Sequence, residues 1–140
     1  MKTGGCLCGA VRYEVEGEPV FTGLCHCRDC QKATGSGHVP AMAMPRSGVK
    51  ITGETKGFSV VGDSKRTLTR NFCPTCGSLI FSESDGMPGL VLLTAGTLDD
   101  TSGFKPQVAI YTRSRPQWEH GGEGVPEFEG PPPPPPASGG

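Results

Sequence analysis

The sequence has few of the residues that build a large hydrophobic core, and it has no long apolar run. Only 34% of its 140 residues are hydrophobic and 6% are aromatic. The longest apolar stretch, around Leu90–Leu93, is far too short to cross a bilayer. The first residues, MKTGGCLCGA, lack the apolar segment of a secretory signal. We therefore expect a small cytoplasmic protein with a thin core and no membrane partner.

An excess of charge of either sign is also missing. The formal net charge is −1, and lysine and arginine do not gather into a basic stripe. A protein without such a stripe lacks the main attraction to the phosphates of nucleic acid. The sequence therefore predicts no nucleic-acid partner, and it does not indicate an oligomeric state.

Long helices are disfavoured by 22 glycines and 14 prolines, because both residue types are penalised in helix interiors. Short segments of β-branched and aromatic residues lie between glycine, proline and aspartate, which is typical of strands. In Val11–Val15 apolar and polar side chains alternate, as they do in a half-buried strand. We predict an all-β domain with little helix, whose strands are 11–15, 20–24, 49–52, 58–61, 67–72, 79–82, 90–94 and 108–112.

The C-terminal end differs from the rest of the chain. From about Gly121 the composition shifts to glycine, glutamate and proline, and six consecutive prolines precede the last residues. Such a run favours an extended polyproline conformation and cannot join the interior of a sheet. We predict one domain over residues 1–129 and a disordered proline-rich tail over residues 130–140.

Seven cysteines offer the additional cross-links that a thin core needs. An odd number argues against a complete set of disulfides, and clustered cysteines in a reducing compartment more often bind metal. Thiolates two or three residues apart reach one ion from a tight turn, as they do in zinc sites. Gly9 and Gly77 follow two of the groups and allow positive φ in such turns. The groups are Cys6-x-Cys8, Cys25-x-Cys27-x-x-Cys30 and Cys73-x-x-Cys76.

Seven ligands divide naturally as four plus three, which predicts two zinc ions per chain. A structural zinc takes four ligands, whereas a catalytic zinc with three protein ligands keeps one position open. The middle group brings three thiolates within six residues, so the two outer pairs are left to share the other ion. Two alternatives stay open: one zinc with idle cysteines elsewhere, or closure of the middle site by His38. His26 alternates away from Cys25 and Cys27 in an extended segment and is not an expected ligand.

An open three-thiolate zinc favours chemistry at sulfur. Three thiolates leave the ion a weaker Lewis acid than three histidines do, so activation of water is not expected. A soft thiolate suits such an ion better as the fourth ligand, and zinc keeps the thiol in its nucleophilic form. The sequence therefore points to a small-molecule thiol or thioether as substrate.

The chain resembles the glutathione-dependent formaldehyde-activating enzyme family, whose domain also includes the centromere protein V-like proteins. The resemblance covers about residues 3–129. The matching segments are Gly5-Cys6-x-Cys8-Gly9-Ala10-Val11, Cys25-His26-Cys27-x-x-Cys30-Gln31-Lys32, Arg70-Asn71-Phe72-Cys73-x-x-Cys76-Gly77-Ser78 and Ala95-Gly96-Thr97-Leu98-Asp99.

This resemblance implies an all-β, tent-like fold of small sheets around zinc. It implies a structural zinc at Cys6, Cys8, Cys73 and Cys76 and a catalytic zinc at Cys25, Cys27 and Cys30. It also implies a carbon–sulfur lyase related to S-(hydroxymethyl)glutathione synthase, with glutathione or another small thiol as partner.

Lys32 and Arg70 lie within three residues of a predicted zinc ligand and are candidates to bind the carboxylates of the thiol substrate. The alternative function is a non-catalytic, zinc-stabilised binding module. A redox or zinc sensor that uses the three-thiolate loop is a third interpretation, because exposed thiolates oxidise readily. The identity of the fourth ligand at the middle cysteines separates the enzyme from the binding module.

Overall fold

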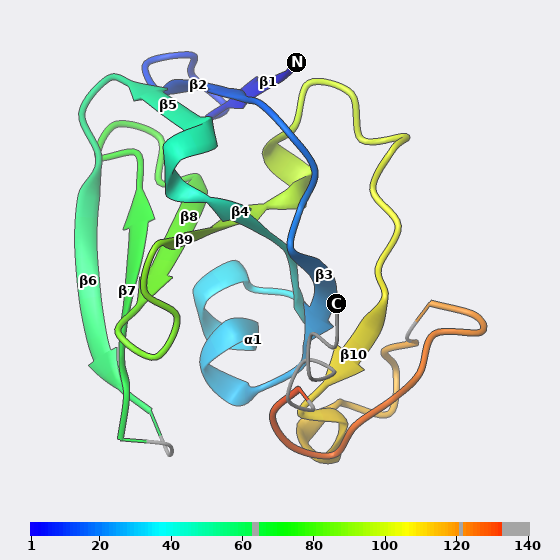
Figure 1. Ribbon diagram of the computed structural model, residues 1–140. Coiled ribbons are helices and arrows are strands. Elements are labelled where there is room, and N and C mark those ends of the chain that lie inside the picture. Colours follow the sequence, from blue (N-terminus) through cyan, green and yellow to red (C-terminus); the bar gives the residue numbers. More distant parts are fainter. Residues whose placement is uncertain (63–64, 121, 133–140) are drawn as a thin grey trace. The chain divides into compact units, whose positions relative to one another are not determined.

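The structure is a computed structural model that describes residues 1–62, 65–120 and 122–132 (Figure 1). The chain divides into two compact units, each built from two stretches of sequence. Unit 1 comprises Met1–Thr22 and Pro40–Lys105, and unit 2 comprises Gly23–Val39 and Pro106–Gly140.

A three-stranded antiparallel sheet opens unit 1. Its strands, in spatial order, are β1 (Lys2–Gly5), β2 (Arg12–Val15) and β5 (Val49–Thr52). Along β2, Tyr13 and Val15 are buried whereas Arg12 and Glu14 are exposed. The alternation of apolar and polar side chains therefore places one face of this strand against the core, as the sequence predicted.

The remaining strands of unit 1 pair in a continuous antiparallel series. They are, in spatial order, β4 (Val39–Pro45, in unit 1 from Pro40), β9 (Leu90–Thr94), β8 (Leu79–Ser84), β7 (Thr67–Phe72) and β6 (Lys56–Val61). Two short 3₁₀ turns, η1 (Arg46–Gly48) and η2 (Ala95–Thr97), follow β4 and β9. β6 and β7 form a long hairpin in Figure 1.

Unit 1 contains the main hydrophobic core. Its buried cluster joins β2, β4, β8 and β9 through side chains such as Tyr13, Met42, Ile80 and Leu93. Cys6 and Cys73 belong to the same cluster. The first and last cysteine groups are therefore anchored in the packed interior of this unit.

Unit 2 is built from two parallel strands, a short helix and the chain that follows them. Its elements are β3 (Phe21–Cys25, in unit 2 from Gly23), α1 (Arg28–Thr34), β10 (Val108–Ile110) and the 3₁₀ turn η3 (Thr112–Ser114). Gly35 ends α1 in the left-handed conformation. The later chain runs beside β10, where the Ala109 N–H donates to the Pro126 carbonyl (2.9 Å) and the Phe128 N–H donates to the Ala109 carbonyl (2.8 Å).

The all-β prediction is confirmed, and three strands have the predicted bounds: 49–52, 67–72 and 90–94. The structure adds β1, β4 and α1, which the sequence did not predict. The predicted tail over residues 130–140 lies almost entirely outside the described residues. Among the helices of the described part, none has the length and apolar character needed to span a membrane.

Candidate metal centres

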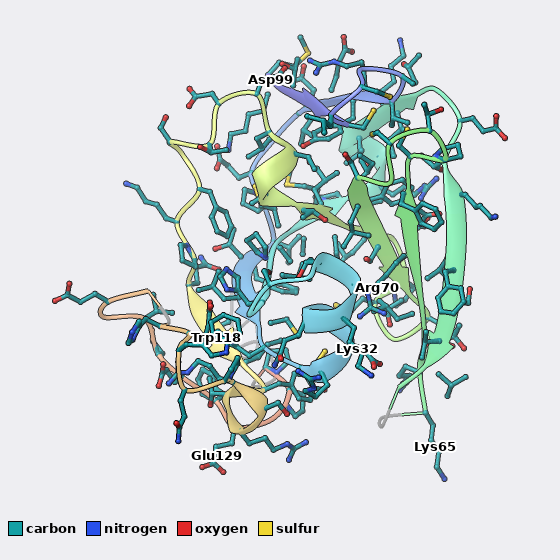
Figure 2. The ribbon with its side chains drawn as sticks, turned by 180° about the vertical axis from the view of Figure 1, so that it is seen from behind. Lys32, Lys65, Arg70, Asp99, Trp118 and Glu129 are labelled. Atoms are coloured by element: carbon teal, nitrogen blue, oxygen red, sulfur yellow. The ribbon has the colours of Figure 1, made fainter. Side chains whose placement is uncertain are left out.

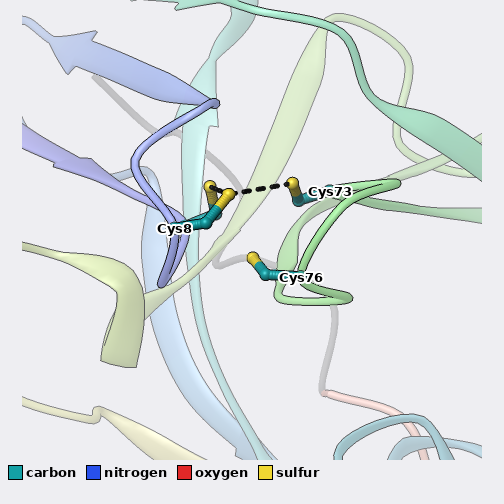
Figure 3. A group of neighbouring side chains, drawn as sticks. Cys8, Cys73 and Cys76 are labelled. Carbon is teal, nitrogen blue, oxygen red and sulfur yellow. Dashed lines mark hydrogen bonds between the residues drawn. The ribbon is translucent and has the colours of Figure 1, made fainter.

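Unit 1 brings the first and last cysteine groups together. The Sγ atoms of Cys6, Cys8, Cys73 and Cys76 all lie within 4.8 Å of one another. Two loops carry them, one between β1 and β2 and the other between β7 and β8, and these loops face each other in Figure 3. The Cys8 Sγ lies 3.6 Å from that of Cys6 and 3.8 Å from that of Cys73. None of the seven cysteines, all of which the structure describes, forms a disulfide.

Each of these loops is a tight turn that includes a glycine with positive φ. The Gly9 N–H donates to the Cys6 carbonyl (3.2 Å), and the Gly77 N–H donates to the Cys73 carbonyl (2.8 Å). The φ angles are 84° at Gly9 and 79° at Gly77, in a region that strains residues with a Cβ atom. The positive φ predicted for these two glycines is confirmed, and the turns bring both cysteines of each pair into the same four-sulfur cluster.

Hydrogen-bond donors near two of the sulfur atoms favour their thiolate forms. The Val11 N–H donates to the Cys6 Sγ (3.2 Å), and this bond is the main cause of a lowered pKa at Cys6. The Ser78 hydroxyl lies 3.2 Å from the Cys76 Sγ. This contact, together with the Ser78 N–H, lowers the pKa of Cys76 to about 5.

Cys8 shows the opposite behaviour within the same cluster. The Ala10 N–H lowers its pKa, but the Cys6 thiol, burial and the other two sulfur atoms together raise the pKa of Cys8 to about 11. Four neighbouring thiols therefore do not all ionise by themselves. A divalent cation would stabilise all four as thiolates, so the donor set fits a four-coordinate metal such as zinc.

Unit 2 holds the middle cysteine group within one short segment. The Sγ atoms of Cys25, Cys27 and Cys30 lie within 4.8 Å of one another. No further His, Cys, Asp or Glu among the described residues joins this group. Cys25 ends β3, Cys27 is the N-cap of α1, and the Cys30 N–H donates to the Cys27 Sγ (3.3 Å). The junction between strand and helix therefore directs all three thiols to one point.

The electrostatics of this group also fit a bound cation. Hydrogen bonding to Cys27 is the main cause of a strongly raised pKa at Cys25, followed by hydrogen bonding to Cys30 and by burial. Three thiolates this close repel one another, and the charge of a divalent cation offsets that repulsion. The residues present can therefore hold a metal ion.

The Gln31 side chain fixes the backbone of this segment. It is buried, and its Nε2 donates to the His26 carbonyl (2.8 Å) and to the Ser114 carbonyl (2.9 Å). Its Oε1 accepts a hydrogen bond from the Arg28 guanidinium. Because the His26 carbonyl lies between two of the cysteines in the chain, Gln31 limits how far their backbone can move.

His26 and His38, which were discussed above as possible ligands of the middle cysteine group, lie in a different group. Ring nitrogens of His26 and His38 and a carboxylate oxygen of Glu119 lie within 4.8 Å of one another. Burial is the main cause of a lowered pKa at His26. The described residues thus give no support to closure of the three-cysteine group by His38.

Comparison with known proteins decides the family. A sequence profile of the glutathione-dependent formaldehyde-activating enzyme matches residues 1–114. The chain belongs to this family. A curated Halomonas elongata protein, named "Putative glutathione-dependent formaldehyde-activating enzyme", is 26% identical over 121 residues, which cover 82% of this chain and 77% of the relative. A crystal structure of a Rhodobacter sphaeroides protein shares the fold, with a TM-score of 0.57 at 21% identity over 90% of this chain and 98% of that one.

In this member of the glutathione-dependent formaldehyde-activating enzyme family, the two predicted substrate-binding residues lie in different units. Lys32 is exposed in the last turn of α1, in unit 2 (Figure 2). Arg70 lies on β7 in unit 1, and only 8% of its surface is exposed, so it is not an ordinary surface charge. Both remain predictions as substrate-binding residues.

Sequence reasoning missed the roles of Gln31 and Glu119. Gln31 directly follows the last cysteine of the middle group, so its place in the motif was the available signal. Glu119 is 81 residues away from its partner His38 and has no local signal of any kind. Only the fold of unit 2 reveals it.

Proposed function

We propose that this protein is a zinc-dependent carbon–sulfur lyase that acts on a thiol adduct of the glutathione–formaldehyde type. The observation that carries the proposal is the group of Cys25, Cys27 and Cys30, which offers three thiol ligands and, among the described residues, no fourth His, Cys, Asp or Glu. A zinc site of three protein ligands leaves a position for substrate. Membership of the family supports the glutathione-related chemistry.

The donor set favours a thiol over water as the incoming ligand. A zinc ion held by three thiolates would accept a soft fourth thiolate and keep it nucleophilic at neutral pH. In the forward direction, the thiolate sulfur forms a bond to the carbonyl carbon of formaldehyde while the carbon–oxygen π bond breaks and its electron pair moves to the oxygen. The carbonyl oxygen takes up the proton that the thiol has lost, and the reverse reaction breaks the same carbon–sulfur bond.

The protein's own residues position this chemistry. The Cys30 N–H donates to the Cys27 sulfur, and Gln31 holds the backbone on which the cysteines lie. Lys32 follows on the same helix with its ammonium group exposed, so it can pair with a carboxylate of the thiol substrate. Arg70, on β7 in unit 1, stays a prediction from the sequence.

The four-cysteine group has a different role in this proposal. Cys6, Cys8, Cys73 and Cys76 would hold a structural zinc, because four thiolates complete the tetrahedral coordination that zinc prefers. Such a site has no position left for substrate. The protein would then carry two zinc ions with separate tasks.

Cobalt substitution tests the open position. Replacing zinc by Co²⁺ and adding glutathione at millimolar concentration should change the thiolate-to-cobalt absorption, because a further thiolate joins the ion. S-Methylglutathione is the matched control, since it keeps both carboxylates and has no thiol. If glutathione and its S-methyl derivative both leave the spectrum unchanged, the site is closed and the non-catalytic binding module replaces the enzyme.

A second measurement separates binding of the thiol from recognition of its carboxylates. Lys32→Ala should weaken the response to glutathione and leave the response to 2-mercaptoethanol unchanged, because only glutathione carries carboxylates. Formation of the hydroxymethyl adduct from glutathione and formaldehyde, followed by NMR, then tests the lyase activity itself. Thiol binding without any acceleration of this reaction would contradict the proposed substrate pair.

A further inference from the structure

The imidazole of His26 is buried with one nitrogen unused. Its side chain has a relative exposure of 0%, and Nδ1 lies 3.1 Å from the Gly37 carbonyl oxygen. Because a carbonyl oxygen only accepts, Nδ1 carries the proton and Nε2 presents its lone pair. Within the part of the chain that the structure describes, Nε2 has no hydrogen-bond partner.

Two further potential ligand atoms lie close to the imidazole of His26. A ring nitrogen of His26, a ring nitrogen of His38 and a carboxylate oxygen of Glu119 all lie within 4.8 Å of one another. The two imidazole rings have their centroids 5.4 Å apart and are tilted by 55°. The Nδ1 of His38 contacts the Glu119 Oε1 directly. All three residues belong to unit 2.

Gly37 makes this close arrangement possible. A Cβ atom at that position would collide with the carboxyl group of Glu119. The same residue supplies the carbonyl that orients His26. One backbone position therefore holds the imidazole in place and leaves room for the carboxylate beside it.

We propose that His26, His38 and Glu119 form a third metal site, which binds a borderline first-row divalent cation such as Zn²⁺. Two imidazole nitrogens and one carboxylate oxygen are ligands that zinc and its neighbours accept. A metal-bound histidine usually donates its other N–H to a backbone carbonyl or carboxylate, as His26 does to Gly37. The site uses none of the cysteines and leaves one position for water or an added ligand.

A cobalt titration of the full-length protein, loaded with only the two equivalents of Zn²⁺ that the cysteine groups would hold, tests the site. We expect one additional equivalent of Co²⁺ to bind with d–d absorption and without thiolate-to-cobalt charge transfer, because the ligands are nitrogen and oxygen. Cobalt that replaces zinc at the cysteines would show the charge-transfer band, which distinguishes it from cobalt at the histidine and glutamate ligands. No additional equivalent in the wild-type protein would overturn the proposal.

Variants at the two less buried ligands make the test specific. His38→Ala and Glu119→Gln should each weaken binding of the additional Co²⁺ equivalent by at least about 10-fold, because the loss of even an outer-shell partner of a metal ligand costs about 10–100-fold in affinity. His120→Ala is the matched control, because this exposed imidazole is adjacent to Glu119 in the chain and lies outside the group. Equal affinity in all three variants and the wild type would contradict the assignment. Circular dichroism and an unchanged metal content at the cysteines verify that each variant is folded.

The ring nitrogens of His26 give an independent readout that spares this buried residue from mutation. In ¹⁵N-histidine-labelled protein, added Zn²⁺ should shift the Nε2 resonance of His26 and leave Nδ1 protonated. In Glu119→Gln the same shift should require a far higher Zn²⁺ concentration. An Nε2 resonance that stays unchanged at saturating Zn²⁺ would show that the lone pair does not bind metal.

Discussion

The four-cysteine group of unit 1 and the three-cysteine group of unit 2 both offer sulfur as ligand atom. They differ in how far apart in the sequence their cysteines lie and in whether the hydrophobic core surrounds them. In unit 1, Cys8 and Cys73 are 65 residues apart in sequence, and Cys73 is part of the hydrophobic core. In unit 2, the three thiols lie within one short stretch that joins β3 to α1. A cluster that joins distant segments contributes to the folding of its unit, whereas a local cluster shapes only its own loop.

The two units also differ in the kind of side chain that they bury. Unit 1 buries a continuous set of apolar side chains from several strands. In unit 2, polar side chains such as His26 and Gln31 are buried and held by hydrogen bonds to backbone carbonyls. Hydrophobic packing therefore supports unit 1 together with its cysteines, and directed polar contacts support unit 2. Each of the following experiments separates these two kinds of support.

The largest effect is expected for Cys73→Ser in unit 1. Zinc binding contributes roughly 10–16 kcal/mol to the folding of small zinc peptides. A domain of this size has only about 5–15 kcal/mol of net stability. We therefore expect Cys73→Ser to be unfolded or aggregated, as measured by circular dichroism and size-exclusion chromatography. A soluble Cys73→Ser protein with native circular dichroism would show that the four-cysteine group is not needed for the fold.

A smaller structural effect is expected for Cys30→Ser in unit 2. The variant should stay soluble with near-native circular dichroism, because the outer cysteine pairs remain intact. It should contain one metal ion fewer than the wild type and lose the cobalt response to glutathione. If Cys30→Ser unfolds as completely as Cys73→Ser, then the middle group is structural and the enzymatic proposal loses its main support.

The smallest effect on stability is expected for Gln31→Ala. Loss of this side chain leaves the carbonyls of His26 and Ser114 without their donor, which costs about 1–3 kcal/mol in the free energy of unfolding. The cysteine ligands are retained, so metal content should stay at the wild-type value while thiol affinity decreases. Urea denaturation and the cobalt titration measure the two effects. Gln117→Ala, at an exposed position of the same unit, serves as control and should change neither quantity.

Local pattern was sufficient to predict most strands of unit 1. In β2 the alternation of side chains has a period of two, and β7 and β9 are rich in threonine, leucine and valine between turn residues. β1 and β4 were not predicted from the sequence because their residues have weak strand propensity. Gly4 and Gly5 end β1, and β4 contains alanine, methionine and proline. Pairing with neighbouring strands, which no local pattern encodes, determines both strands.

Helix α1 and the group of His26, His38 and Glu119 were not predicted from the sequence, for two different reasons. α1 has only seven residues, and its N-cap is the thiol of Cys27 in place of the usual hydroxyl, amide or carboxylate. The cysteine groups themselves could be assigned because their spacing is a local property. The approach of Glu119 to His38 depends on the fold of unit 2, and it also requires the absence of a side chain at Gly37. Sequence spacing contains no sign of either condition.

The separation of 65 residues between Cys8 and Cys73 has a consequence for the nascent chain. At a synthesis rate of about 5–20 residues per second, Cys73 leaves the ribosome roughly 3–13 s after Cys8. During this interval the first pair is a half-site, whereas the middle group is already complete soon after α1 has emerged. Under the two-zinc proposal, the three-cysteine group therefore has the first opportunity to bind an ion, and the four-cysteine group can bind its ion only later. Under the proposed two-zinc assignment, a shortage of zinc during synthesis would affect folding before it affects the proposed catalysis.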